Sequence, residues 1–555
     1  MYKLLLLISA LIALSLARSI PFSIFHTTDV HGWLLPKRHN PLEDADFGDL
    51  LSFVEHANKT AIKEGRNFLL FDTGDQVQGT GLSDATPVIG SVVLQATDKI
   101  PYDGLTIGNH ELGVPETIDW MRTNYRHLKE GRVVSGNVIY SDGKHFAAQS
   151  RTMYSSGTGH KVLVLGFMYN DQYPHKNTIV QTVEKTVTSS KFISIMKESQ
   201  DVAFIVVMCH FEHSNPETLT IHNQIRRFLP KTGIVYLTGH THQQKWQTID
   251  NNAIAMESGC YYHSVGRIDF AFDDSTGKLD KVSHKWIKAN RQALIAESGV
   301  SESQFDTDNG LALKKFLVEQ FKKLGLDKVL GCAKQKLDRY APISQANSVF
   351  KLFLNDIFPS FMNKESKNQQ ILIMNTGSVR AHIFQGEVTV DDLMSVDPFD
   401  NVYVTFPDLT ILQLQALLGK VHMSADMNGG LPKYYHSWYF DTYPGYDVVT
   451  DDYTAIKLQA MLEAIDPSRV WEYYPYKTKF NTSRKAWHNF IVNSPDWKCP
   501  TETSLLASVP YTSVLAYVGG AVVFTAFVSL LVGLFGRRSV KSGSGPSEDL
   551  VESLL

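Results

Sequence analysis

Between Pro21 and Ile268, short apolar runs repeatedly end in polar, glycine-containing turns, and this alternation limits the possible folds more than any other feature of the sequence. Each run has the length and the β-branched or aromatic content of a buried strand. The runs are residues 24–26, 68–71, 104–107, 162–167, 202–208 and 234–237. Helix-like stretches at 49–64 and 183–200 separate several of them. The pattern therefore predicts a layered α/β domain.

The chain is too long for one hydrophobic core. At 555 residues, two domains are the expectation. We expect a first domain at 21–300, a connecting helix at 301–333 and a second α/β domain at 334–498. The connecting helix is predicted from an apolar stripe: Leu313, Phe316, Leu317, Phe321 and Leu324. The second domain is expected to begin with a helix (348–358), a strand (371–374) and a polar turn (375–380).

Both ends of the chain carry targeting features. Residues 1–17 contain one lysine, an apolar run and small residues at 15 and 17, which predicts a signal peptide; a membrane anchor is the alternative. Residues 514–535 are almost wholly apolar, which predicts a transmembrane helix. Arg537, Arg538 and Lys541 follow directly, so 536–555 is expected to be a cytoplasmic tail. This topology is a single-pass type I membrane protein with its main part lumenal or extracellular.

Composition argues against two classes of protein: disulfide-dense scaffolds and proteins that bind nucleic-acid polymers. Four cysteines are too few for a disulfide-dense scaffold; Cys332 and Cys499 are candidates for a pair, Cys209 is expected to be a buried thiol, and Cys260 stays open. The net charge of -4 and the lack of a long basic stretch argue against a nucleic-acid polymer as partner. Sequons at Asn58 and Asn481 are compatible with an exported glycoprotein.

Polar clusters stand where the predicted strands end. They are Asp29-Val30-His31, Gly74-Asp75, Gly108-Asn109-His110-Glu111, Cys209-His210 and Gly239-His240-Thr241-His242. A short carboxylate that bridges two divalent ions, ringed by imidazole and amide ligands, needs these residue types, and Asp75 is the natural bridge. Donors of this kind suit zinc, manganese or iron. The lack of a set of thiolate ligands argues against a structural zinc site. We expect the glycines to allow sharp turns that bring the clusters together.

In this order the clusters resemble the calcineurin-like metallophosphoesterases, specifically the 5′-nucleotidase family, over residues 25–453. The resemblance implies an α/β (α+β) fold: a four-layer domain of two β-sheets flanked by helices, followed by a smaller α/β substrate-binding domain, with catalysis in the cleft between them. It implies that one metal ion is held by Asp29, His31, Asp75 and His242. It implies that the other is held by Asp75, Asn109, His210 and His240.

The resemblance also implies catalytic and substrate-binding residues. Asn109 and His110 would be catalytic, with His110 beside the metals. Asn375 and Arg380 would contact the substrate, and Phe399 would stack on the nucleobase. The family's aspartate two residues after the Gly-Asn-His-Glu motif is Gly113 here. Either Glu116 or Asp119 substitutes for it from the following helix, or the enzyme is slow.

A second departure affects base recognition. Residues 450–453 resemble the start of the family's last motif, but its glycine-rich loop with an aromatic residue does not follow. Trp438, Tyr443, Tyr446 and Tyr453 are the candidate replacement rings. With these departures the chain resembles a divergent fungal and protist branch of the 5′-nucleotidase family.

The resemblance implies a hydrolase of phosphoric esters. The expected reaction converts a nucleoside 5′-monophosphate, AMP-like, to nucleoside and phosphate by in-line attack of a hydroxide bridging two metal ions. One alternative is a phosphodiester or pyrophosphate hydrolase acting on nucleotide sugars, cyclic nucleotides or lipid head groups. The other, motivated by Gly113, is a catalytically weak ligand-binding ectodomain.

Overall fold

The computed structural model describes residues 19–171, 177–423, 431–440, 442–480 and 482–500. The predicted signal peptide, membrane helix and cytoplasmic tail lie outside these residues. In the part of the chain that the structure describes, no helix is long and apolar enough to cross a membrane. The elements below belong to one compact unit that ends at Trp497.

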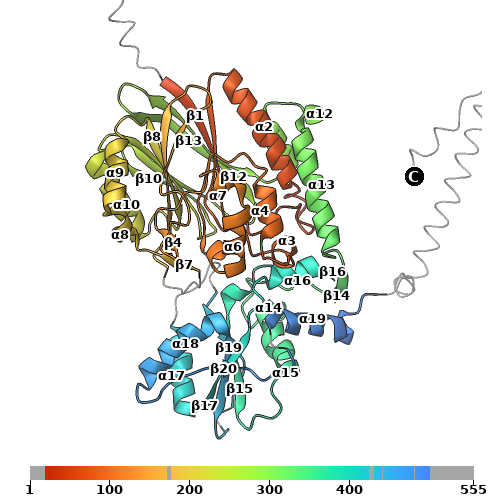
Figure 1. Cartoon of the computed structure of the whole chain (residues 1–555). Coiled ribbons are helices and arrows are strands. Elements are labelled where there is room, and N and C mark those ends of the chain that lie inside the picture. Colours follow the sequence, from red (N-terminus) through yellow and green to blue (C-terminus); the bar gives the residue numbers. More distant parts are fainter. Residues whose placement is uncertain (1–18, 172–176, 424–430, 441, 481, 501–555) are drawn as a thin grey trace, which may run out of the picture. The chain divides into compact units, whose positions relative to one another are not determined.

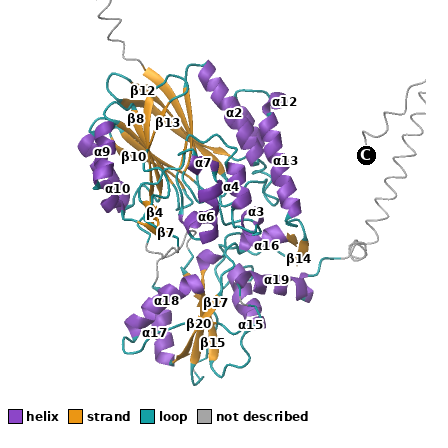
Figure 2. Ribbon diagram, viewed as in Figure 1, coloured by secondary structure: helices purple, strands orange, loops and turns teal. Residues whose placement is uncertain are grey.

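Two β-sheets face each other in the N-terminal half (Figures 1 and 2). The first has the order β13-β12-β1-β2-β3. Its strands are β1 (Ser19–Thr27), β2 (Asn67–Asp72), β3 (Gly104–Leu105), β12 (Ser264–Asp273) and β13 (Lys278–Lys288). The second has the order β10-β11-β9-β8-β6-β5. Its strands are β5 (Arg151–Tyr154), β6 (Lys161–Met168), β8 (Phe204–His210), β9 (Gly233–Thr238), β10 (Gln244–Asp250) and β11 (Ala253–Ser258).

Helices cover the outer face of each sheet, so the domain has the four layers that the resemblance implied (Figure 2). On the first sheet lie α2 (Phe47–Lys63), α4 (Ser91–Thr97), α6 (Pro115–Asn124), α11 (Arg291–Ser298) and α13 (Asp308–Lys323). On the second lie α8 (Val183–Val187), α9 (Ser190–Glu198) and α10 (Pro216–Phe228). Shorter elements are α3 (Gly81–Asp84), α5 (Asn109–Leu112), α7 (Arg126–Lys129), α12 (Glu302–Phe305), β4 (Val138–Tyr140) and β7 (Thr178–Val180).

Burial on both faces explains why the strands read as continuous apolar runs. In β1, Phe22 and Ile24 lie in the core between the sheets, whereas Phe25 lies in the core under α2. Across the inter-sheet core, the rings of Phe22 and Phe204 meet edge to face at 4.9 Å. The same pattern on β8 places alternate residues in the inter-sheet core and in the core under α10.

Local capping sets the helix boundaries. The N-cap Asp46 accepts a hydrogen bond from the backbone of Asp49, whose side chain accepts one in return, and this capping box begins α2. The single helix predicted at 183–200 is two helices, because the Ser189 side chain accepts a hydrogen bond from the Phe192 backbone and starts α9 anew. The sequon residue Asn58 lies within α2, where its side-chain oxygen is buried. Asn481 lies outside the described residues.

The C-terminal half contains a five-stranded sheet of order β18-β15-β19-β17-β20. Its strands are β15 (Gln369–Asn375), β17 (Tyr403–Leu409), β18 (Tyr434–His436), β19 (Tyr446–Asp451) and β20 (Tyr474–Pro475). One face carries α17 (Ile411–His422) and α18 (Asp452–Ile465). The other carries α14 (Val349–Leu352), a π-helical turn (Phe353–Ile357), α15 (Phe358–Phe361) and α19 (Ser483–Asn493). The predicted helix at 348–358 and strand at 371–374 are therefore present.

A few smaller elements complete this half. β14 (Val329–Ala333) pairs with β16 (Gly386–Thr389), and α16 (Val390–Val396) follows. Short 3-10 turns occur at Thr376–Ser378 and Pro495–Trp497. Gly81 in α3 donates its backbone N–H to Asp391 in α16 at 2.8 Å, which joins the two halves. Cys332 and Cys499 are each disulfide-bonded, whereas Cys209 and Cys260 are free and buried.

Candidate metal centre

The polar clusters lie at the carboxyl ends of parallel strands. Asp29 and His31 follow β1, Asp75 follows β2, and Asn109 begins α5 just after β3. His210 ends β8, and His240 and His242 follow β9. Because β1 runs parallel to β2, and β8 parallel to β9, their ends deliver these side chains to one edge of each sheet. The edges of the two facing sheets bring the residues to one place.

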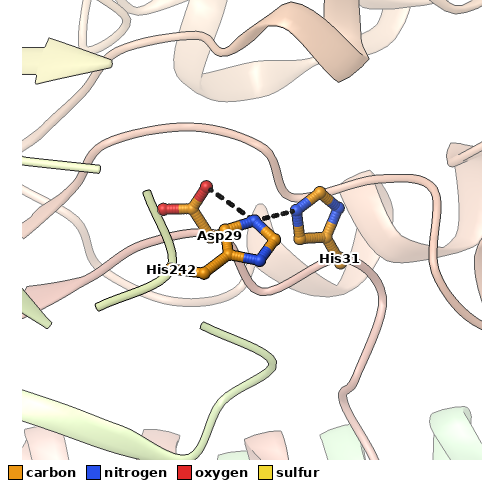
Figure 3. A group of neighbouring side chains, drawn as sticks. All are labelled: Asp29, His31 and His242. Atoms are coloured by element: carbon orange, nitrogen blue, oxygen red, sulfur yellow. Dashed lines mark hydrogen bonds and ion pairs between the residues drawn. The ribbon is translucent and has the colours of Figure 1, made fainter. Parts of the chain in front are cut away.

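Asp29, His31 and His242 form one group of potential ligands (Figure 3). The Nε2 atoms of His31 and His242 are 3.1 Å apart, and His242 Nε2 is 3.5 Å from Asp29 Oδ1. The backbone N–H of His240 also donates to the Asp29 carboxylate at 3.0 Å. Asp29 thus ties the loop after β1 to the loop after β9.

Asp75, His210 and His240 form a second group, and Asp75 also belongs to a third with His31 and His110. His210 Nε2 lies 3.0 Å from Asp75 Oδ2, and His31 Nε2 lies 3.8 Å from the same oxygen. Asp75 is therefore shared between the two sets of imidazoles. The Asn109 side-chain oxygen is buried and has no hydrogen-bond partner among the described residues, as expected of an atom meant for a ligand.

Backbone carbonyls orient two of the candidate ligand imidazoles. His31 Nδ1 donates to the Gln78 carbonyl oxygen at 2.8 Å, and His210 Nδ1 donates to the Thr73 carbonyl oxygen at 2.7 Å. In a neutral imidazole, a proton held at Nδ1 leaves the lone pair on Nε2, which is the atom that faces the cluster. This second layer of contacts is the arrangement typical of metal-binding histidines.

Burial keeps most of these imidazoles neutral. It lowers the pKa of His31 and His240 to about 4. Burial, with a smaller contribution from Arg380, lowers the pKa of His242 to about 3. Against its own burial, Asp75 has its pKa held well below the usual range, chiefly by His210 and then His110. His210 is the exception: against its own burial, the Asp75 carboxylate raises the pKa of His210 to about 10, so this imidazole must release a proton before Nε2 can bind a metal ion.

The backbone at the cluster is unusual. Asp29, His31, Asp75, His240 and His242 all have positive φ, between 49° and 77°. L-residues adopt this left-handed region at a cost, and such residues cluster at functional sites. The fold therefore imposes this geometry on the cluster.

The glycines of the cluster act in two ways, which partly corrects the prediction from sequence. Gly74 has a positive φ of 89°, so the sharp turn expected there is present. Gly108 is extended and matters for space: a Cβ there would lie 2.0 Å from Asp75 Oδ1 and 2.6 Å from His210 Cε1. A Cβ at Gly239 would lie 2.3 Å from Thr28 Oγ1. These two glycines let neighbouring loops touch.

Two residues support the cluster in ways that the sequence analysis did not predict. Glu111, whose pKa burial raises to about 7, accepts backbone hydrogen bonds from Asp75 (2.9 Å), Gln76 (2.7 Å) and Gly108 (2.7 Å). Gln78 accepts a hydrogen bond from His110 Nδ1 through its side-chain oxygen at 2.7 Å. Glu111 lies within the Gly-Asn-His-Glu motif, which could have identified it, whereas no pattern marks Gln78.

The substitutes expected for the missing aspartate do not contact His110. Glu116 and Asp119 are exposed, and Asp119 instead accepts a weak hydrogen bond from Asn177. They lie on the solvent side of α6, whereas the His110 ring turns toward Asp75, with Nε2 3.8 Å from Asp75 Oδ2. Burial lowers the pKa of His110 to about 3, so its imidazole is neutral.

The predicted substrate residues have different surroundings. Phe399 lies against His110, with ring centroids 5.6 Å apart, and Arg380 lies over Phe399 at 5.1 Å. The Arg380 Nε is buried without a hydrogen-bond partner among the described residues. The Asn375 side-chain oxygen accepts a hydrogen bond from the Gly377 backbone at 2.8 Å and so shapes the turn. The structure brings Arg380 and Phe399 to the candidate metal ligands, whereas the Asn375 oxygen is engaged locally.

A cleft of about 920 Å³ opens beside His242. Its lining includes Trp33, Tyr261, Arg339, Tyr340, Arg380 and Phe384. The replacement rings proposed from sequence do not line it. Tyr446 is fully buried and donates to the Phe440 carbonyl, whereas Trp438 is 81% exposed. Aromatic side chains for a ligand come instead from the loop after β1, the loop after β11 and the segment before β16.

Comparison with known proteins matches both halves of the chain. A family model described as calcineurin-like phosphoesterase matches residues 22–244, and one described as NAD nucleotidase, C-terminal domain, matches 338–432. An uncharacterised protein of Saccharomyces cerevisiae is 28% identical over 75% of this chain and 72% of its own length. A protein of Arthroderma benhamiae named a secreted protein is 26% identical over 70% of this chain and 65% of its own.

Among solved structures, the crystal structure of a 5′-nucleotidase from Candida albicans is similar, with a TM-score of 0.79 and 24% identity. The match covers 85% of this chain and 98% of the Candida chain. At this identity the likeness concerns the fold, and it extends over both halves.

Proposed function

Because this chain belongs to the calcineurin-like phosphoesterases of the 5′-nucleotidase type and is a hydrolase of phosphoric esters, we propose that it converts a nucleoside 5′-monophosphate such as AMP to the nucleoside and phosphate. The observation that carries the proposal is the shared position of Asp75, within reach of His31 and His210. A carboxylate placed in this way suits two divalent ions.

The donor atoms fit such ions. We assign one ion to Asp29, His31, Asp75 and His242, and the other to Asp75, Asn109, His210 and His240. Support comes from the converging Nε2 atoms and from the Asn109 oxygen, buried without a partner among the described residues. Imidazole and carboxylate donors suit zinc, manganese or iron. When bound, the ions supply a water of lowered pKa and stabilise charge on the phosphoryl oxygens.

The remaining residues of the site hold the ester. Arg380, with its Nε buried without a described partner, offers a donor to the phosphoryl oxygens. His110, with its Nε2 directed toward Asp75, is placed to contact the phosphoryl group or the leaving oxygen. The rings of Tyr261, Tyr340 and Phe384 offer surfaces for the nucleoside in the cleft.

The experiment that tests this proposal is a panel of phosphate esters assayed with the full-length purified chain loaded with Zn²⁺, Mn²⁺ or Fe²⁺. We expect nucleoside 5′-monophosphates to have the highest kcat/KM and to release inorganic phosphate. Metal analysis of the same preparation should find two ions per chain. Preference for a diester over every monophosphate would reject this substrate class.

A second candidate is hydrolysis of a nucleotide phosphoanhydride. The match of 338–432 to the C-terminal domain of NAD nucleotidases favours it. The size of the cleft, about 920 Å³, is at the upper end for small-molecule sites and leaves room for a second nucleotide or a sugar. The panel therefore includes NAD and a nucleotide sugar. A kcat/KM for either that exceeds that for AMP would favour this candidate.

We also propose that the chain enters the secretory pathway and is anchored in a membrane by 514–535 with residues 536–555 in the cytoplasm. The apolar sequence of that segment and the name of the Arthroderma relative support this proposal. Fractionation of cells that express the full chain tests it. Recovery in carbonate-washed membranes is expected, and complete release by carbonate would contradict it.

A further inference from the structure

We propose that Gln78 is the positioning residue of His110, in the place of the carboxylate that Gly113 lacks. The inference rests on the proposed function, because it concerns how His110 is held beside the ester. It deepens that function by assigning a role to a residue that no sequence motif identifies.

The contact is short and sheltered. His110 Nδ1 and Gln78 Oε1 are 2.7 Å apart, and the His110 side chain is 11% exposed. The His110 backbone N–H donates to Asp75 Oδ1 at 2.9 Å, which fixes the start of the side chain. The Gln78 contact fixes its far end. Together they set the direction in which Nε2 points.

The chemistry of the amide explains the choice of residue. A neutral imidazole carries its proton on one nitrogen only, and an acceptor at Nδ1 places that proton there. The lone pair then lies on Nε2, on the side of Asp75, where it can take up a proton from solvent and pass that proton to the leaving oxygen. A carboxylate would set the same tautomer and would also favour the imidazolium, whereas an amide sets the tautomer without adding charge.

Gln78 is itself held in place by the backbone. Its φ is +61°, its N–H donates to Ser83 Oγ at 2.8 Å, and its carbonyl oxygen accepts the hydrogen bond from His31. The backbone of this residue therefore serves His31, while its side chain serves His110. Substitution of the side chain can remove the second contact and leave the first.

Gly113 and Gln78 are complementary in space. A Cβ at Gly113 would meet the Gln78 Oε1 at 4.0 Å and the Asn109 carbonyl oxygen at 3.4 Å, which are ordinary contacts. The backbone of Gly113 is right-handed helical, with φ of -68°, so an aspartate can stand there without strain. An aspartate at 113 would reach toward the same imidazole that Gln78 now contacts. An aspartate at position 113, at the end of α5, could therefore replace Gln78 as the hydrogen-bond acceptor for His110.

The experiment is a double-mutant cycle in the full-length, metal-loaded protein. Gln78→Met keeps the length of the side chain and removes the acceptor. We expect it to lower kcat for AMP about tenfold to a hundredfold and to leave KM and metal content unchanged. In the His110→Ala background the same substitution should have no further effect on kcat. An equal loss in both backgrounds would overturn the proposal, because Gln78 would then act without His110.

Restoration of the acceptor provides the second test. Gln78→Glu should retain activity at least at the level of the parent, and adding Gly113→Asp to Gln78→Met should recover at least fivefold of the lost kcat. Failure of both restorations would also overturn the proposal. A parent protein that hydrolyses no ester in the panel would instead reject the proposed function, so the two failures are distinguishable.

Discussion

The ring of Phe399 lies against the imidazole of His110, with an angle of 25° between the two planes. Arg380 lies over the same ring, so Phe399 already has two polar neighbours. The expectation from sequence was that Phe399 stacks on a nucleobase. In the structure a base would compete with these contacts.

Phe399→Ala should therefore lower kcat for every ester, including p-nitrophenyl phosphate, which has no base. Loss of an aromatic contact worth about 0.5–1.5 kcal/mol predicts a twofold to tenfold decrease. Phe440→Ala is the matched control, since the Phe440 side chain is 65% exposed and does not line the cleft. An effect confined to the KM of nucleotides would show base stacking instead.

Gly108→Ala should abolish metal binding, because the added methyl group would overlap Asp75 Oδ1 and His210. Metal analysis after dialysis measures this directly, and we expect less than one ion per chain. Gly419→Ala is the control: nothing lies within 4 Å of a Cβ there, and the position is helical. That variant should keep both ions and gain up to about 1 kcal/mol of stability. Retention of both ions by Gly108→Ala would contradict the close packing of the two loops.

Asp75→Asn should remove the carboxylate shared between the two ligand groups. We expect kcat to fall at least about a thousandfold, since each of the two proposed ions would lose a ligand. Chelation by EDTA should lower the Tm of the parent and leave that of the variant nearly unchanged. Asp142→Asn, at an exposed carboxylate beside Arg122, is the control and should behave like the parent. A variant that still responds fully to EDTA would disprove the bridging position.

Asp84 provides a test of stability against pH. Burial raises its pKa to about 7, and its Oδ1 has no hydrogen-bond partner among the described residues. Because the folded pKa lies above the unfolded value near 3.8, the folded chain binds more protons between these values, and this group lowers stability as pH rises from about 4 to 7. Asp84→Asn keeps an acceptor for the Gly79 N–H and removes the charge.

The variant should therefore be more stable than the parent at pH 8, by about 1–3 kcal/mol, and equal to it at pH 4. Thermal unfolding of the two proteins at both pH values measures the difference. A constant difference across the range would mean that the carboxylate does not titrate as stated.

Sequence pattern was sufficient for the architecture. Runs of apolar residues reflect burial on both faces of a strand, so the strands could be located and the four layers follow from the family resemblance. The convergence of Asp29, Asp75 and His210 was also predictable, because parallel strands end at a common edge.

Contacts between loops were not predictable. The residue that accepts the hydrogen bond from His110 Nδ1 is set by the path of the turn after β2, which brings Gln78 to this imidazole. Glu116 and Asp119 were the expected acceptors because they are close to His110 in the sequence. Likewise, the sequence does not show that Tyr446 is fully buried and that its ring therefore cannot stack on a nucleobase. The break between α8 and α9 came from a single serine cap within a pattern that otherwise favoured one helix.

The left-handed backbone of the five proposed ligands has a consequence for the cell. Each such residue lowers the stability of the folded chain by roughly 1 kcal/mol or more, and only the folded chain can recover that energy by taking up ions. If the metal ion is scarce in the compartment where the chain folds, the amount of this protein should fall first. Chains without bound metal would unfold more often and be degraded by proteases before their loss of activity became important.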